Sequence, residues 1–254
     1  MNPRPIAVAA MAVPHGFFTR EGGVSAGPFA SLNASLSGAD DRALVLENRA
    51  RAARSLGADP ALLVGLTQVH GADVVTVTEP WAPGAGPRAD AMVTVRPGIA
   101  LGIVTADCAP VLCADAEAGV VGAAHAGWRG ALAGVLEATV AAMTALGARK
   151  ARIAAAIGPC IAQASYEVGA DLRDAVLARD PADGRFFAAG RAGRWQFDLA
   201  GYCRARLLAA GVAADVTGHD TLADAARFFS HRRRTLAGGG PIGHQISVIA
   251  CARS

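Results

Sequence analysis

Hydrophobic residues recur at helical spacing in four stretches of the chain. Between Asp41 and Leu56, leucine, valine and alanine are interleaved with arginine and glutamate, and Gly57 follows, which predicts a helix that ends at this glycine. Asp198 is placed to cap another helix, because its carboxylate can accept hydrogen bonds from the free N–H groups of a first turn. The helices predicted besides the first cover 131–146, ended by Gly147, 171–178, and 198–209.

Two apolar runs of strand character lead into side chains that can do chemistry. The run 99–105 leads into Asp107 and Cys108, and the run 119–124 leads into His125. Strand ends that open onto turns place side chains at the edge of a rigid sheet, where functional sites are usually built. We therefore expect a site within 99–130 that contains a thiol, a carboxylate, an imidazole and the guanidinium of Arg129.

Backbone breakers follow both runs. Pro110 comes shortly after the first, and Gly127 and Gly130 bracket Trp128 and Arg129 after the second.

Helices and strands alternate without the regularity of a doubly wound parallel sheet. The pattern therefore predicts an α+β (mixed α/β) layered sandwich with a mixed β-sheet, in a single domain over 1–254. Other strands are predicted within 5–36, as a pair joined at Gly71 within 62–78, and at 89–95, 153–157, 212–217 and 245–251, with a Pro/Gly-rich surface loop over 79–88.

Composition removes several classes of protein. The 254 residues are 52% hydrophobic and 18% charged, which suits a large core and not a disordered chain. The net charge of +3 is small, and basic residues cluster only at 232–234, so no nucleic-acid partner is expected. Lys150 is the only lysine, which argues against Schiff-base chemistry. With five irregularly spaced cysteines and no long apolar run, we expect a cytoplasmic protein with no membrane partner.

Three dispersed residues form the best candidate site. His70, Cys108 and His125 offer two imidazoles and a thiolate, and three protein ligands leave a fourth position of Zn²⁺ open, the pattern of catalytic zinc. The spacing has no motif value by itself, and a buried cysteine with two hydrogen-bonded histidines is the alternative. The signature of zinc nucleobase deaminases is only half present, because Pro159-Cys160 is not followed by a second cysteine at 163.

Six segments resemble the YfiH family in the same order along the chain. They are TQVHGADVV (67–75), ADAMVT (89–94), TADCAPVLCAD (105–115), AHAGWRGALAGV (124–135), AIGPCIAQASYEVG (156–169) and FFSHRR (228–233). Members of this family have been called polyphenol oxidase (laccase-like), purine nucleoside phosphorylase and peptidoglycan-editing factor. The resemblance implies metal ligands at His70, Cys108 and His125, and a sandwich similar to bacterial toxin deamidases that use a Cys/His pair.

The chain departs from the family pattern near its C-terminal end. The family usually has tyrosine where this chain has His231, and a Gly-Arg pair where it has Gly243-His244. A family Cys-Thr pair is replaced by His219-Asp220-Thr221. These departures put in doubt any anion contact that the missing arginine would make.

The resemblance favours a zinc-dependent purine nucleoside enzyme that phosphorolyses adenosine, inosine or methylthioadenosine, with adenosine deamination as a further reaction. Zn²⁺ would lower the pKa of a bound water toward about 7. Asp107 is expected to orient a histidine, act as a base or cap a turn. Arg129, placed just before the helix predicted from 131, is expected to bind phosphate or to form a surface ion pair. The weaker candidates for substrate contact are Asn33, Arg49 and Gln68.

Two alternatives remain open at this point. An amidase-type hydrolase acting on a muramoyl-peptide precursor of peptidoglycan would use Cys108 as nucleophile and His125 as its base. A copper polyphenol oxidase is disfavoured, because laccase chemistry needs several copper ions and the chain has six histidines. Copper is the alternative to zinc as the metal held by His70, Cys108 and His125.

Overall fold

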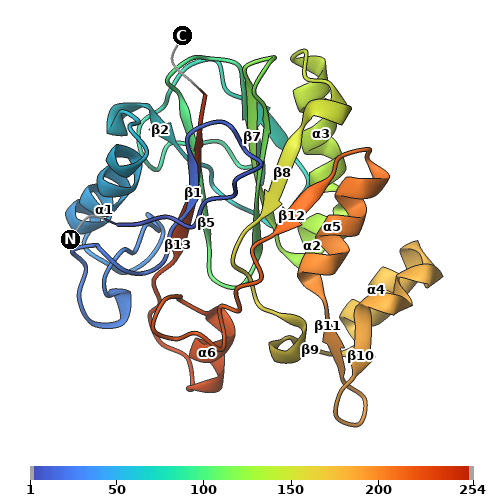
Figure 1. Ribbon diagram of the computed structural model, residues 1–254. Coiled ribbons are helices and arrows are strands. Elements are labelled where there is room, and N and C mark those ends of the chain that lie inside the picture. The colour runs from blue at the N-terminus through green and yellow to red at the C-terminus, as the bar shows by residue number, and fades with distance from the viewer. Residues whose placement is uncertain (1–2, 252–254) are drawn as a thin grey trace.

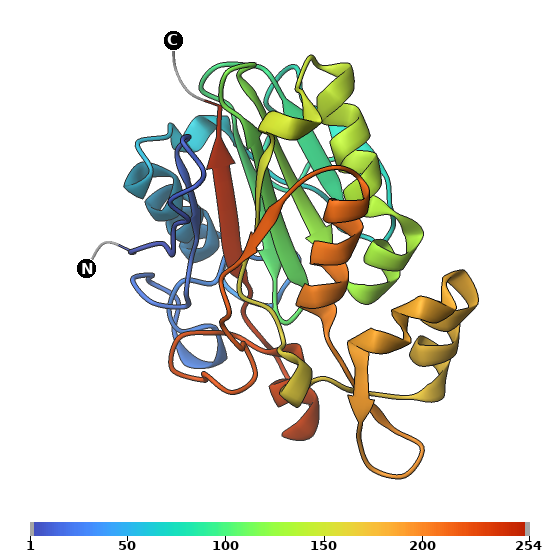
Figure 2. The same ribbon diagram turned by 45° about the vertical axis from the view of Figure 1, so that its right-hand side comes forward.

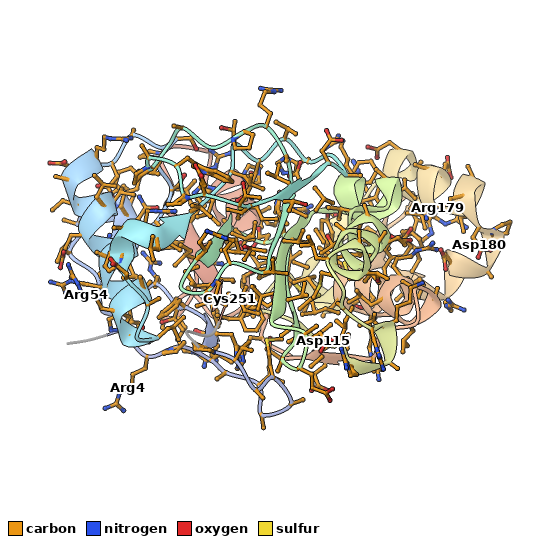
Figure 3. The ribbon with its side chains drawn as sticks, turned by 90° about the horizontal axis from the view of Figure 1, so that it is seen from above. Arg4, Arg54, Asp115, Arg179, Asp180 and Cys251 are labelled. Carbon is orange, nitrogen blue, oxygen red and sulfur yellow. The ribbon has the colours of Figure 1, made fainter. Side chains whose placement is uncertain are left out.

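Two β-sheets packed face to face, with helices on both outer sides, form the body of the molecule (Figure 1). The computed structural model describes residues 3–251. Seen from above, α1 lies at one end of the stack of layers and α3 and α4 lie toward the other (Figure 3). The α+β sandwich with mixed sheets that the sequence predicts is confirmed.

The larger sheet has six strands, with an antiparallel pair at its centre. Its order is β12 (Ala214–Val216), β8 (Ala154–Ile157), β6 (Ala109–Asp115), β7 (Val120–Ala126), β4 (Ala91–Thr94) and β3 (Val74–Thr76). The outer pairs β12–β8 and β3–β4 are parallel, whereas the inner pairs are antiparallel. The second sheet has the order β1 (His15–Phe17), β13 (Gln245–Ala250), β5 (Ala100–Thr105) and β2 (Leu63–Val64).

The alternation of side chains along the strands divides the core into three parts. In β6, Leu112 points between the sheets and Val111 points toward the helices. In the second sheet, Ile103 points between the sheets, and Val248 points toward α1. Both sheets are therefore buried on two faces. The layer of α1 (Arg42–Ser55) covers the four-stranded sheet, and the opposite layer contains α2 (Trp128–Ala133), α3 (Val135–Ala145) and α5 (Leu199–Ala209).

A small three-stranded sheet projects from the body beside α4 (Ala170–Arg179) (Figure 2). Its order is β10 (Phe187–Ala189), β11 (Trp195–Phe197) and β9 (Glu167–Val168). The last helix, α6 (His231–Leu236), is capped by Ser230, whose hydroxyl accepts from the N–H of Arg233. The sequence pattern predicts neither the small sheet nor α6. Short 3-10 turns lie at Gly27–Phe29, Pro60–Leu62, Lys150–Arg152, Gln163–Ser165 and Pro181–Phe186.

Most predicted elements are confirmed, including the Asp198 cap, whose carboxylate accepts from the N–H of Gly201. The segment 79–88 forms no helix or strand, as predicted for a loop. Within residues 3–251, no helix is both long and apolar enough to cross a bilayer. The division into a single domain stays a prediction, and its ends at 1–2 and 252–254 lie outside the described residues.

Two predictions are wrong. Pro110 does not end a strand but lies in β6, where its carbonyl accepts from the N–H of Gly158, the residue directly after β8. The N–H that proline lacks would face the same residue, so the missing bond falls at the end of this ladder. The helix predicted over 131–146 is two helices, because Gly134 adopts a left-handed conformation with φ of +98° between them. The two strands predicted within 62–78 are both present, as β2 and β3, and they belong to different sheets, since β2 joins β5 and β3 joins β4.

We expect Gly158→Ala to destabilise the fold where the two sheets meet. A Cβ at this position would collide with Cδ1 of Phe17, whose ring is fully buried. Overpacking of this kind costs about 1–3 kcal/mol. Denaturant unfolding measures the loss, and Gly38→Ala is the control, because a Cβ at Gly38 meets nothing within 4 Å. Equal unfolding free energies for the two variants would contradict the predicted packing.

Candidate functional site

Side chains from three separate segments meet at one end of the sandwich. His70 lies on the loop between β2 and β3, Cys108 on the turn between β5 and β6, and His125 in β7. The Sγ of Cys108 lies 4.0 Å from Nε2 of His70, and one donor atom from each of the three residues lies within 4.8 Å of the others. We call these three residues the His-Cys-His cluster. Within the described residues it is the one group of three or more metal-ligating side chains that converge in this way.

Backbone strain marks two positions of the site. His70 has φ of +61° and Asp107 has φ of +87°, and they are the two non-glycine residues of the described chain with positive φ. Such conformations cost free energy for residues with a Cβ and persist where surrounding bonds enforce them. In this structure they turn the His70 loop and the Cys108 turn toward His125.

A buried carboxylate that sequence reasoning did not select, Asp90, holds two of the three cluster residues. Its Oδ1 lies 2.8 Å from Nδ1 of His125 and accepts from the N–H of His70 at 2.9 Å. Its Oδ2 accepts from the N–H of Gly71 at 2.7 Å. With Nδ1 held by Asp90, Nε2 of His125 is left as the ligand atom, the arrangement common in metal sites. In the sequence, Asp90 lies between two alanines at the start of an apolar run, and this position could have indicated a buried carboxylate.

Asp107 does not orient a histidine. Its carboxylate accepts from the hydroxyls of Thr221 and Ser230, at 2.6 and 3.0 Å, and from the N–H of Arg232 at 2.6 Å. It therefore fixes α6 against the turn that carries Cys108. Of the roles expected for Asp107, the geometry agrees with capping and gives the orienting role to Asp90.

Charge coupling within the cluster favours a thiolate beside a protonated imidazole. Burial opposes ionisation of the Cys108 thiol, but His125 and His70 lower its pKa to about 6. Burial also opposes protonation of His125, but Cys108 and Asp90 raise its pKa to about 9. Near neutral pH, and without a bound cation, the pair is therefore an ion pair with Asp90 behind it.

A cavity of about 590 Å³ opens at the cluster and extends along the outer face of β5. Arg129 lies at this cavity, inside the first turn of α2 and not before a helix as predicted, with its guanidinium 4.5 Å from the ring centroid of Trp128. No ion pair joins it to an acidic side chain within residues 3–251. Other lining residues include Ser35, Ser37, Arg49, Gly65, Gln68, Gly102, Val104, Tyr166, His231, Arg232 and His244.

The weaker candidates from the sequence have different positions. Gln68 lines the cavity, but its side chain is bonded to the backbone of Val104 in both directions, at 2.8 and 3.0 Å. Asn33 is fully buried, and its amide bonds to Asp40, to the N–H of Ser35 and to the N–H of His244. These two residues therefore hold the cavity walls. Arg49 is buried and lines the cavity.

Two of the positions that depart from the family pattern, His231 and His244, also line the cavity. Burial lowers the pKa of His244 to about 4, and nearby His231, His125 and Arg234 act in the same direction. His244 is therefore neutral near pH 7. It does not supply the positive charge that an arginine would have at this position.

The donor set of the cluster fits a thiophilic transition metal. Zinc–sulfur and zinc–nitrogen bonds of about 2.3 and 2.0–2.1 Å place tetrahedral donors about 3.3–3.6 Å apart. The cluster donors, within 4.8 Å of one another, need a contraction of about 1 Å to reach this separation. A lowered thiol pKa and a histidine fixed at its second nitrogen by a carboxylate are both features of metal ligands.

A family model described as multi-copper polyphenol oxidoreductase laccase matches residues 14–252. The chain belongs to this family. A curated relative from Deinococcus radiodurans, called purine nucleoside phosphorylase, is 45% identical over 250 residues, which are 96% of this chain and 91% of the relative. One from Streptomyces griseus, called purine nucleoside phosphorylase ORF3, is 45% identical over 87% of this chain and 89% of its own length.

Solved structures of family members have the same fold. YlmD from Geobacillus stearothermophilus aligns with a TM-score of 0.90 at 33% identity, covering 100% of this chain and 97% of its own. The Bacillus licheniformis protein YfiH aligns with a TM-score of 0.86 at 32% identity, covering 93% of this chain and 91% of its own. The resemblance to the YfiH family is thus confirmed, whereas the similarity to toxin deamidases stays a prediction.

We expect Asp90→Asn to weaken metal binding by about 10- to 100-fold, the usual effect of removing a carboxylate behind a histidine ligand. The amide keeps the shape of the side chain but presents N–H groups where His125 and the His70 loop need an acceptor. Competition with a chelator measures the affinity. Asp73→Asn, in an exposed position on the same loop, is the control. Identical affinities in the two variants would contradict the role of Asp90.

Alkylation of the metal-free protein tests the charge state of Cys108. With a pKa of about 6, its reaction with iodoacetamide should rise from pH 5 to pH 7 and level off above, because the thiolate is the reactive form. A typical thiol with a pKa of about 8.5 would still gain in rate at pH 8. Mass spectrometry assigns the label, and the other four cysteines are buried. A midpoint near pH 8.5 would contradict the ion pair.

Proposed function

We propose that this protein is a zinc-dependent purine nucleoside phosphorylase. The proposed substrates are phosphate and adenosine, inosine or methylthioadenosine, with adenosine deamination as a further reaction. The main support is the cluster of one thiol and two imidazoles in a cavity large enough for a small ligand, in a chain 45% identical to a relative called purine nucleoside phosphorylase.

His70, Cys108 and His125 would hold the metal. When bound there, Zn²⁺ supplies a Lewis acid and lowers the pKa of water that it binds. Asp90 keeps the proton of His125 on Nδ1, so that Nε2 faces the cluster. Copper also accepts thiolate and imidazole ligands, and elemental analysis of the purified protein distinguishes the two metals.

The cavity walls supply the remaining contacts for the proposed substrates. Arg129 carries a positive charge at the cavity that no described acidic side chain neutralises, which suits a phosphate oxygen. Trp128 and Tyr166 also line the cavity, and aromatic rings of this kind suit a flat purine base. Ser230 and Thr221 act indirectly, since they hold Asp107 and through it the turn of Cys108.

One observation favours a second candidate function, an amidase-type hydrolase that edits peptidoglycan precursors. Cys108, His125 and Asp90 are arranged as a nucleophile, its base and a carboxylate that orients the base. Such an enzyme needs neither a metal nor His70. For a laccase-type oxidase, by contrast, the described chain has a single cluster of metal-ligating side chains, and several copper ions are required.

His70→Ala separates the two candidates. A metal enzyme loses a ligand, so we expect phosphorolysis to fall to background and Cys108 to alkylate faster than in the zinc-loaded wild type, because the metal no longer occupies the thiolate. The release of free purine base from adenosine, inosine or methylthioadenosine with phosphate measures activity. The control is Asp73→Asn, because Asp73 is exposed. His15→Ala is unsuitable as a control, because the His15 side chain is buried and hydrogen-bonded.

The parallel assay uses a muramoyl-peptide precursor without added metal. A His70→Ala protein that retains most of its activity on this substrate, with Cys108 labelled rapidly already in the wild type, would refute the metal mechanism. The cysteine hydrolase would then be the better assignment.

A further inference from the structure

Arg49 is a buried cation without a buried anion. Its side chain comes from α1 and is 6% exposed, and its one hydrogen bond within the described chain runs from Nη1 to the carbonyl of Ala34 at 3.2 Å. No carboxylate of residues 3–251 forms an ion pair with it. Burial lowers its pKa to about 10, so it stays charged at neutral pH. Arginine is almost never buried in this way unless another group compensates the charge.

The fold makes room for this guanidinium at the cavity wall. A Cβ on Gly65 would lie 3.0 Å from Nη2 of Arg49 and 3.4 Å from the carbonyl oxygen of Gly102. Arg49 and both glycines line the same cavity as the His-Cys-His cluster. The guanidinium therefore lies where Gly102 of β5 and Gly65, directly after β2, lack side chains, next to the cavity and not to a protein partner.

Arg49 and the cluster lie at separate places along the cavity, because Arg49 lies beside Gly65 and Gly102 whereas the cluster contains His70 and Cys108. The segment from Gly65 to His70 runs beside β5, with Gln68 bonded to Val104 on the way. From Gly102 to Thr105 the strand rises about 10 Å, at about 3.3 Å per residue. A ligand that reaches both ends must therefore be elongated, with an anionic group at the end near Arg49.

Hydroxyl groups lie near the same end. Ser35 and Ser37 line the cavity, follow directly on the Ala34 carbonyl that Arg49 contacts, and have their oxygens 3.2 Å apart. One of these hydroxyls donates to the other, and the second is free to donate to a ligand oxygen. A guanidinium with a hydroxyl beside it matches the several oxygens of a phosphoryl group.

We propose that Arg49, with the hydroxyls of Ser35 and Ser37, forms a phosphoryl-binding subsite at the end of the cavity remote from the cluster. The group is either inorganic phosphate or a phosphate carried at the 5′ end of a purine nucleoside, and Arg129 serves a separate position. The assignment to a purine ligand rests on the proposed function, but phosphoryl binding itself does not require turnover.

Calorimetric titration of the metal-loaded protein tests the subsite with three probes: inorganic phosphate, adenosine 5′-monophosphate and adenosine. Arg49→Met removes the charge at similar volume, and Arg4→Met removes an exposed arginine that projects away from the body as the control (Figure 3). Loss of a charge-assisted contact should raise the Kd of the phosphoryl probe by about tenfold to a hundredfold. The Kd of adenosine should change little in either variant.

A second pair of variants covers the case in which Arg49→Met does not fold. Gly65→Ala keeps the charge but pushes the guanidinium from its place, whereas Gly38→Ala adds a methyl group in open space. We expect weaker phosphoryl binding in the first and wild-type binding in the second. Binding of inorganic phosphate that depends on Arg49 identifies free phosphate as the ligand. Binding of adenosine 5′-monophosphate alone identifies the 5′-phosphate of a nucleotide.

Wild-type affinity for both phosphoryl probes in Arg49→Met, or in Gly65→Ala where Arg49→Met is unfolded, would overturn the subsite. So would a wild-type protein that binds neither inorganic phosphate nor the monophosphate. Phosphoryl binding that depends on Arg49 without any phosphorolysis would leave the subsite standing and refute the proposed function. Phosphorolysis together with phosphoryl binding that does not depend on Arg49 would refute the subsite and leave the proposed function standing.

Discussion

The geometry of the site depends on one buried carboxylate. Asp90 is fully buried directly before β4, and it accepts hydrogen bonds from the His70 loop and from the ring of His125 at the same time. A buried charge of this kind is stable only when its oxygens are satisfied, and here the satisfying groups are the ones that carry the site. When the core forms and buries Asp90, its carboxylate therefore also holds His70 in place, despite the strained backbone of that residue.

The packing of two sheets determines where the cavity lies. β5 is covered by the six-stranded sheet on one face and by α1 and the 34–37 segment on the other. Along the second face Gly102 has no side chain, and the backbone of Val104 is hydrogen-bonded to the side chain of Gln68. The cavity therefore continues between Arg49 and the cluster. Its floor is rigid strand, which favours a fixed separation between the two ends.

The same three side chains are suited to two kinds of chemistry. A thiolate and an imidazolium with a carboxylate behind them form a nucleophilic site, and the same thiolate with two neutral imidazoles forms a metal site. The difference lies in His70, which is exposed and whose ring, unlike that of His125, bonds to no carboxylate within the described chain. A metal would give His70 a definite role, whereas a cysteine nucleophile would leave it unused.

The sequence by itself determined the helices of strong periodicity, the strands around the site, the α+β class and the three members of the cluster, the last through resemblance and not through spacing. Local patterns failed at Pro110 and Gly134. A proline is compatible with a strand where the bond that it cannot make falls at the end of a ladder, and a left-handed glycine divides one apolar stripe into two helices. Only the tertiary structure showed that Asp90, and not Asp107, orients His125, and that Arg49 is buried without a counter-charge. Hydrogen-bond partners and burial depend on segments far apart in the chain, and hydrophobic periodicity contains no information about which of them meet.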